Sequence, residues 1–79
     1  MKIIFTSYAE DTISDRAIPK EEIIDALLFP FEIKEGMDGR FIAHKIFGEK
    51  LLRVVFEISK NTYIVVTAYY TNQRRYIEK

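Results

Sequence analysis

The sequence predicts an α+β fold in which two N-terminal helices pack on an antiparallel β-sheet, in the order β-α-α-β-β-β-β. Apolar residues recur every three or four positions up to Pro30, as in amphipathic helices. After Pro30 they alternate with polar residues, as in half-buried strands. With 79 residues the chain has room for a single domain, residues 1–79.

The part of the chain before Pro30 is predicted to form one short strand and two helices. Residues 3–5 form the strand, and Ser7 with Glu10 fits a capping box that starts a helix over residues 8–16. Pro19 suits the first turn of the second helix, because its missing N–H would have no partner there anyway. Apolar residues line one side of that helix, which ends before the next proline.

Four strands are predicted after the helices, over residues 31–36, 40–47, 51–58 and 63–70. Asp38-Gly39 is typical of a two-residue hairpin turn. Gly48-Glu49 and residues 59–61 supply the next two turns. Short turns of this kind join neighbouring antiparallel strands, so these four strands are expected to form a meander.

The composition excludes several classes of protein. The sequence has no cysteine, which excludes disulfides and thiolate metal sites, and its single histidine leaves too few ligands for a structural zinc site. Its apolar runs are far shorter than the roughly 20 residues that span a bilayer. We therefore expect a cytoplasmic protein that contacts no membrane and needs no metal or other cofactor.

The net charge is zero, but the charges are unevenly distributed along the chain. Residues 1–39 hold four basic and nine acidic side chains, whereas residues 40–79 hold eight basic and three acidic ones. The basic half suggests an anionic partner. The plain alternative is that these are solvated side chains on strands.

The candidate chemistry lies in this basic half. Strand alternation places Arg40 and His44 on one face of a strand, and Arg53 belongs to the next strand. Arginines beside a histidine and a tyrosine suit metal-free ribonuclease chemistry. In that chemistry a base removes the 2′-hydroxyl proton, an acid protonates the leaving 5′-oxygen, and guanidinium groups stabilise the charge on phosphorus. The predicted catalytic residues are His44, Arg53, Arg74 and Tyr76, and the predicted RNA-binding residues are Arg40, Lys45 and Arg75.

Two plainer interpretations stay open. A lone strand histidine is more often a structural residue than a catalyst, and a dibasic pair such as Arg74-Arg75 is more often simply solvated. The protein would then be a small binding module without catalysis. Such a module could form a homodimer through an exposed sheet edge or through the apolar tail around Ile77.

The helical part of the sequence resembles a known family. Residues 8–23 read YAEDTISDRAIPKEEI and are followed by Ala26-Leu27 and Pro30. They resemble H-A-x-x-R-x-x-x-R-G-I-S-x-x-E-[IV]…A-L…P, the signature of domain of unknown function 4258. Residues 48–55 and 64–69 resemble the two closing strands of that family, roughly G-K-x-L-R-V-V and I-x-V-V-T-V-Y.

The family is similar in fold to the RelE/ParE-like toxins of type II toxin–antitoxin pairs. The resemblance implies an endonuclease that cleaves mRNA on the ribosome and is neutralised by an antitoxin protein. By position, Arg16 matches the second arginine of the signature and Arg53 the arginine on the penultimate strand. RelE-like enzymes use basic strand residues with a C-terminal tyrosine or histidine, which loosely correspond to Arg53, Arg74, Arg75 and Tyr76. Since the same superfamily includes gyrase inhibitors, a topoisomerase inhibitor is a third interpretation.

The chain departs from the signature at three positions. Tyr8 replaces the histidine, Thr12 the first arginine and Ala17 the glycine. If the signature histidine has a function in the family, this protein lacks it or uses His44 instead.

Overall fold

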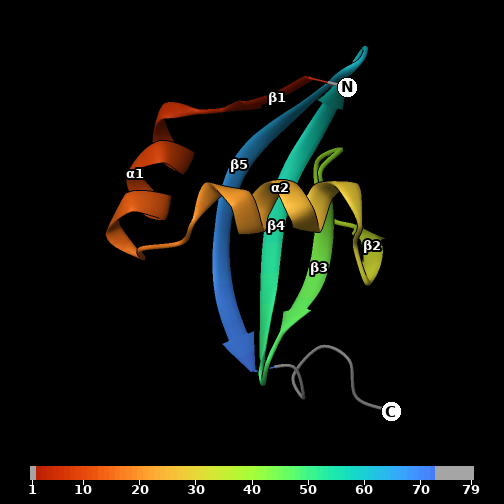
Figure 1. The fold of residues 1–79 in the computed structure, drawn as a ribbon. Helices are drawn as coiled ribbons and strands as arrows, with labels where there is room; N and C mark the ends of the chain where they lie inside the picture. The colour runs from red at the N-terminus through yellow and green to blue at the C-terminus, as the bar shows by residue number, and fades with distance from the viewer. Residues whose placement is uncertain (1, 73–79) are drawn as a thin grey trace.

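The computed structural model describes residues 2–72, which form two helices and five strands. In chain order the elements are β1 (Lys2–Phe5), α1 (Ser7–Asp15), α2 (Lys20–Leu28), β2 (Glu32–Glu35), β3 (Phe41–Phe47), β4 (Lys50–Ser59) and β5 (Thr62–Asn72). Both helices lie on one face of a single sheet, and α2 crosses in front of β4 (Figure 1). The α+β class with two helices on a sheet is as predicted.

The sheet is mixed, which corrects the predicted antiparallel sheet. Its strand order is β1-β5-β4-β3-β2. Strands β2 to β5 form the expected antiparallel meander, but β1 pairs in parallel with β5, with Lys2 beside Thr62 and Phe5 beside Val65. Hairpin turns determine the direction of the last four strands only. The two helices carry the chain from the β1 edge to the β2 edge, so no turn relates β1 to its neighbour.

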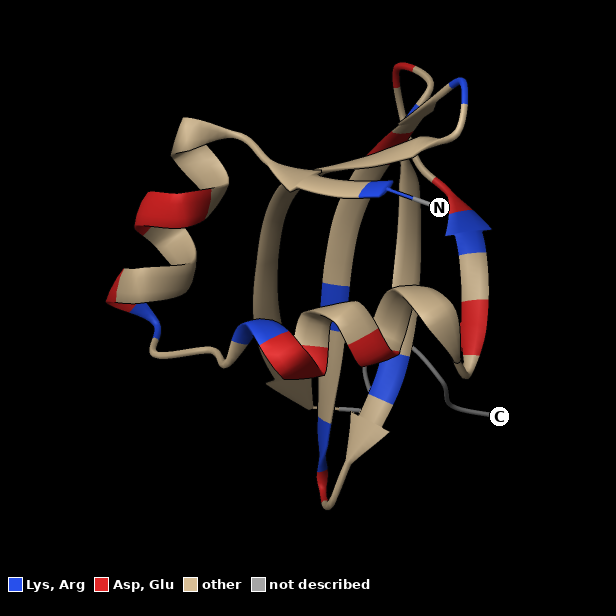
Figure 2. Cartoon of the chain, turned by 45° about the horizontal axis from the view of Figure 1, so that its top comes forward, with Lys and Arg blue, Asp and Glu red and all other residues tan. Residues whose placement is uncertain are grey.

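The hydrophobic core lies between the helices and the sheet. The largest of its fully buried side chains are Phe56, Ile23, Leu52, Val54 and Val65. Figure 2 shows the acidic residues of both helices in red. Those of α1, together with Glu21 of α2, are exposed, whereas Glu22 and Asp25 of α2 are half-buried. The helices therefore cover one face of the sheet. Within residues 2–72, no helical layer covers the other face, which we call the second face.

The first helix begins one residue earlier than predicted. Thr6 is the N-cap, with extended backbone angles (φ −68°, ψ 164°), and its hydroxyl accepts the Ala9 N–H at 3.0 Å. The Thr6 N–H donates to the Val65 carbonyl at 3.1 Å, so β5 holds Thr6 in the extended form that an N-cap needs. Ser7 is consequently the first helical residue, and the predicted Ser7–Glu10 capping box does not form.

The same helix ends in a Schellman motif, in which Ala17 takes the left-handed position. Ala17 has a φ of 55°. Its N–H donates to the Ser14 carbonyl, and the Ile18 N–H donates to the Ile13 carbonyl, both at 3.1 Å. Ile13 and Ile18 are both buried, as the motif's apolar contact requires. This position is where the resembled signature has glycine.

Replacing Ala17 with glycine is expected to stabilise the protein by about 0.5–1 kcal/mol. The alanine side chain is exposed, so its removal costs little packing, whereas glycine relieves the strain of the positive φ. Urea unfolding of Ala17→Gly beside the wild type measures the change. The control is Ala9→Gly inside the helix, where φ is ordinary and glycine should destabilise. An Ala17→Gly midpoint at or below that of the wild type would contradict the prediction.

The connection between β2 and β3 contains a β-bulge. Its tight turn is at Asp38-Gly39, as predicted, with positive φ at both residues (60° and 75°), as in a type I′ turn. The Gly36 N–H donates to the Arg40 carbonyl at 2.8 Å, and the Arg40 N–H donates to the Met37 carbonyl at 3.2 Å. Gly36 and Met37 therefore both lie opposite Arg40.

This bulge changes which side chains meet on the second face. A simple two-residue turn at the same place would put Ile33 opposite His44. The observed partner of His44 is Glu32. A shift of one residue exchanges the two faces of a strand, so the bulge brings a carboxylate to the histidine.

Candidate functional site

A row of polar side chains crosses four strands on the second face. Glu32 on β2 lies opposite His44 on β3, His44 opposite Arg53 on β4, and Arg53 opposite Tyr69 on β5. Arg16, at the end of α1, reaches the far end of this row. The structure thus places His44 and Arg53, two of the predicted catalytic residues, side by side.

The histidine of this row is held by a carboxylate. His44 Nδ1 lies 2.8 Å from Glu32 Oε2, and the side chain of His44 is only 1% exposed, compared with 32% for Glu32. An ionised carboxylate can only accept hydrogen bonds, so Nδ1 donates to it. In the neutral ring Nε2 is then the nitrogen without a hydrogen, which can accept a hydrogen bond.

Two guanidinium groups meet on one tyrosine ring. Arg53 Cζ lies 5.6 Å and Arg16 Cζ 5.8 Å from the centroid of the Tyr69 ring, distances typical of cation–π contacts. Arg16 also donates to the Ala68 carbonyl at 2.8 Å, which fixes the end of α1 against β5. The row therefore presents two positive charges beside a half-buried aromatic face.

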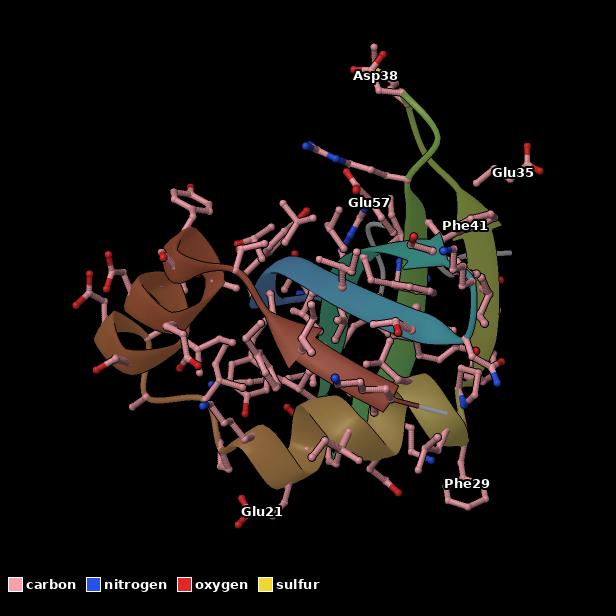
Figure 3. The ribbon with its side chains drawn as sticks, turned by 90° about the horizontal axis from the view of Figure 1, so that it is seen from above. Glu21, Phe29, Glu35, Asp38, Phe41 and Glu57 are labelled. Carbon is pink, nitrogen blue, oxygen red and sulfur yellow. The ribbon has the colours of Figure 1, made fainter. Side chains whose placement is uncertain are left out.

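Two other predicted residues lie away from the row. Arg40 pairs with Glu57 at 3.0 Å, near the end of the sheet where Figure 3 labels Glu57 and Asp38. Lys45 alternates with His44 on β3 and so lies on the helix face. Its amino group donates to the Phe29 carbonyl at 2.7 Å. Neither of these cations joins the row.

The remaining predicted residues are Arg74, Arg75 and Tyr76, which lie outside the described residues. Their predicted roles stay predictions.

Chemically, the row combines an oriented imidazole with two guanidinium groups and an aromatic ring. An imidazole held by a carboxylate can transfer a proton. Guanidinium groups bind phosphate oxygens through several N–H groups at once, and an aromatic ring can stack on a nucleobase. Together these groups suit a nucleic acid strand that is bound through its phosphates.

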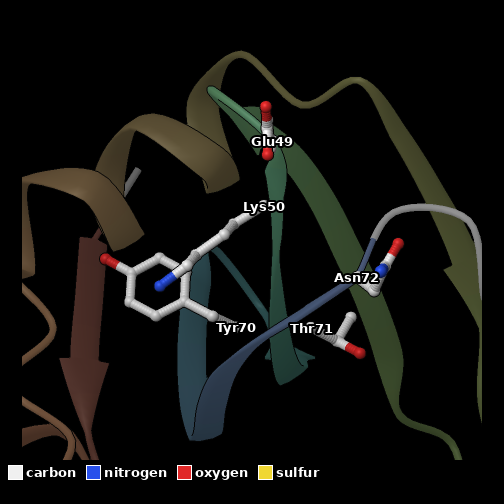
Figure 4. Close-up of a pocket in the computed structure, with 5 residues that line it drawn as sticks. All are labelled: Glu49, Lys50, Tyr70, Thr71 and Asn72. Atoms are coloured by element: carbon white, nitrogen blue, oxygen red, sulfur yellow. The ribbon is translucent and has the colours of Figure 1, made fainter.

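A second cluster lies on the helix side of the sheet, toward the end opposite to Glu57 and Asp38. The Tyr70 hydroxyl donates to a carboxylate oxygen of Glu22 on α2, and Lys50 Nζ lies 5.6 Å from the centroid of the Tyr70 ring. Lys50 and Tyr70 also line a pocket of about 370 Å³, together with Glu49, Thr71 and Asn72 (Figure 4). Burial, with the hydrogen bond to Glu22 and its charge, raises the pKa of Tyr70 to about 12.

This pKa predicts a loss of stability at alkaline pH. Because the folded protein holds the Tyr70 proton more tightly than the unfolded chain, the stabilisation is complete below pH 10. It is lost as the pH rises from the ordinary value of 10.0 to about 12. Urea unfolding should therefore show Tyr70→Phe losing its disadvantage over this range, by about 1 kcal/mol once solvent screening of the partly exposed hydroxyl is taken into account. Tyr8→Phe, at an exposed tyrosine, serves as the control. A constant difference between Tyr70→Phe and the wild type would contradict the prediction.

Sequence reasoning missed Glu32 and Tyr69 as members of the row, and it noted Arg16 only as a signature position. Glu32 can be assigned to the row only when the pairing register of β2 with β3 is known. Tyr69 lies opposite Arg53 because β5 contains an irregularity opposite Val55 and Phe56. Neither register follows from strand alternation alone. Arg16 could have been found from the resemblance, which aligns it and Arg53 with arginines of the same family.

Among residues 2–72 there is no group of three or more histidine, aspartate or glutamate side chains placed to hold a metal ion. Within the same range, no helix has the length and apolar character required to cross a membrane.

Comparison with known proteins gives one result. No curated protein and no solved structure matches the chain. A family model described as domain of unknown function (DUF4258) matches residues 5–70, which is most of the 79-residue sequence and includes every member of the polar row. The chain therefore belongs to the DUF4258 family.

Proposed function

We propose that the protein is a metal-independent endoribonuclease of the toxin type, which cleaves mRNA with the polar row on the second face. The observation that carries the proposal is the contact of His44 with Glu32 in the same row as Arg53, Tyr69 and Arg16. This arrangement places a group that can transfer a proton in the same row as cationic groups that can bind a phosphodiester.

In the proposed reaction the RNA supplies its own nucleophile. His44 Nε2 removes the proton of a ribose 2′-hydroxyl, and the 2′-oxygen attacks the adjacent phosphorus. The guanidinium groups of Arg53 and Arg16 stabilise the charge on the phosphate oxygens. The bond from phosphorus to the 5′-oxygen breaks, and Tyr76 donates the proton that this oxygen needs. The products are a 2′,3′-cyclic phosphate and a 5′-hydroxyl.

We also propose the RelE/ParE-like assignment and the partners that it brings, the ribosome and an antitoxin protein. Its support is the resemblance together with the arrangement of two helices on one face of a small sheet. Arg74 and Arg75 would extend the RNA-binding surface in this proposal.

A non-catalytic binding module is the second candidate, and one observation favours it. His44 is only 1% exposed, so RNA reaches its imidazole only if the groups around it move. In this second candidate, the Glu32–His44 hydrogen bond serves to hold the short strand β2 on the sheet. A topoisomerase inhibitor, which would act by binding a protein and not by cleaving RNA, is also a non-catalytic binding module.

The test is an actively translating extract to which the purified protein is added without metal. The expected result is cleavage of ribosome-engaged mRNA, with 2′,3′-cyclic phosphate at the new 3′ ends. Intact mRNA in the presence of folded protein would contradict the nuclease and favour the binding module. A supercoiling assay run in parallel identifies a topoisomerase inhibitor, which would stop supercoiling and leave RNA intact.

A further inference from the structure

Strand β2 is an edge of the sheet with apolar side chains around it. It is the last strand in the sheet order, and no strand among residues 2–72 pairs with its outer side. Four large apolar side chains at this edge are 46–65% exposed, namely Leu28, Phe29, Phe31 and Ile33. Figure 3 shows Phe29 pointing away from the body of the domain. An uncovered edge bordered by apolar side chains is a typical place for another strand to add.

The backbone of β2 has donors and acceptors available on its outer side. The Gly36 N–H points inward, because it donates to the Arg40 carbonyl. The inward and outward direction of backbone groups alternates along an edge strand. The N–H and C=O groups of Ile33 and Glu35 therefore point toward the outer edge. The alternation stops at Phe31, whose N–H donates inward to the His44 carbonyl at 2.7 Å, so Ile33 is the residue whose donor and acceptor can both bond to an added strand.

The charges of β2 are complementary to those of a second β2. In an antiparallel pair centred on Ile33, Glu32 lies opposite the partner's Lys34, and Lys34 lies opposite the partner's Glu32. Opposite charges directly across a strand pair are favourable, and like charges are unfavourable. A pair centred one residue later would put Lys34 opposite the partner's Lys34, so the charges select the first register, which is also the one that uses the outward groups of Ile33.

We propose that two copies of the chain form a homodimer through antiparallel pairing of their β2 strands, centred on Ile33. The pairing joins five strands from each copy into one continuous sheet. Because the two-fold axis of such a pair is perpendicular to the sheet, both pairs of helices lie on one side and both polar rows on the other. The partner's Lys34 then lies beside Glu32, at the end of the row that holds His44. The dimer does not depend on the proposed nuclease activity.

The first test is sedimentation equilibrium of the full chain over a range of concentrations. The wild type should be a dimer, and Lys34→Glu should raise its dissociation constant about tenfold or more, because two attractive pairs become repulsive. Lys2→Glu makes the same charge change on β1, the opposite edge, and should leave the dimer intact. A wild type that stays monomeric up to about 1 mM, or a Lys34→Glu dimer as tight as the wild type, would overturn the proposal.

A mixture of two variants tests the register. Lys34→Glu and Glu32→Lys each repel a copy of themselves, but together they restore both opposite-charge pairs, so the mixture should dimerise. Circular dichroism checks that Glu32→Lys folds without the carboxylate that holds His44.

Ile33→Pro keeps the proposal testable if Glu32→Lys does not fold. Proline removes an outward N–H and no inward one, so this variant should be a folded monomer. A folded Ile33→Pro dimer as tight as the wild type would exclude pairing through β2. A wild type that is monomeric alone and associates only with a different protein would likewise overturn the proposal and assign the edge to that protein.

Discussion

Replacing Phe56 with alanine is expected to unfold most of the protein at 25 °C. The side chain is 1% exposed, and its ring centroid lies 5.8 Å from that of Phe41 and 5.0 Å from that of Tyr63. Removing a buried phenylalanine typically costs about 3–5 kcal/mol, because the transfer energy is lost and a cavity remains. A core in a chain of this length supplies roughly 3–5 kcal/mol of net stability, so the loss is comparable to the total.

Circular dichroism and urea unfolding measure this effect. The matched control is Tyr8→Ala, because Tyr8 is 60% exposed and its removal should change the unfolding free energy by less than about 1 kcal/mol. Phe56→Leu keeps most of the buried volume and should lie between the two. A Phe56→Ala protein with native circular dichroism and an unfolding midpoint near that of the wild type would show that the core does not depend on this aromatic cluster.

Replacing Arg53 with alanine is expected to lower the rate of the proposed mRNA cleavage about 100- to 1000-fold, the usual effect of losing one group that stabilises transition-state charge. Arg53 lies beside His44 in the row and on the Tyr69 ring. Its guanidinium would bind the phosphate at the point where the imidazole removes the proton. Arg53→Lys keeps the charge but not the forked geometry, so it should recover only part of the activity.

The control for this variant is Lys20→Ala, which makes the same change of charge. Lys20 on α2 pairs with Glu10 on α1, outside the row, and exposed ion pairs contribute little to stability. Its cleavage rate should therefore stay within a few-fold of the wild type. Urea unfolding of both variants separates loss of activity from loss of fold. Equal losses of activity in the two folded variants would indicate a general effect of positive charge instead of a site.

The sequence by itself determined the elements of this fold, because they depend on contacts between near neighbours. Helical spacing of apolar residues before Pro30 and alternation after it predict two helices followed by strands. The Asp38-Gly39 turn was predicted at the place where the structure has it, because its positive φ angles favour these residues. The pairing of His44 with the strand that carries Arg53 follows from the same meander.

Only the tertiary structure decided how these elements combine into a site. Pairing with β5 makes β1 parallel and holds Thr6 as the helix cap in place of Ser7. The bulge opposite Arg40 brings Glu32 to His44. The end of α1 brings Arg16 to the Tyr69 ring that Arg53 also contacts. These contacts join residues far apart in the chain, and each depends on a strand register. A one-residue bulge changes a register and exchanges the two faces of a strand, and local propensity does not encode that change.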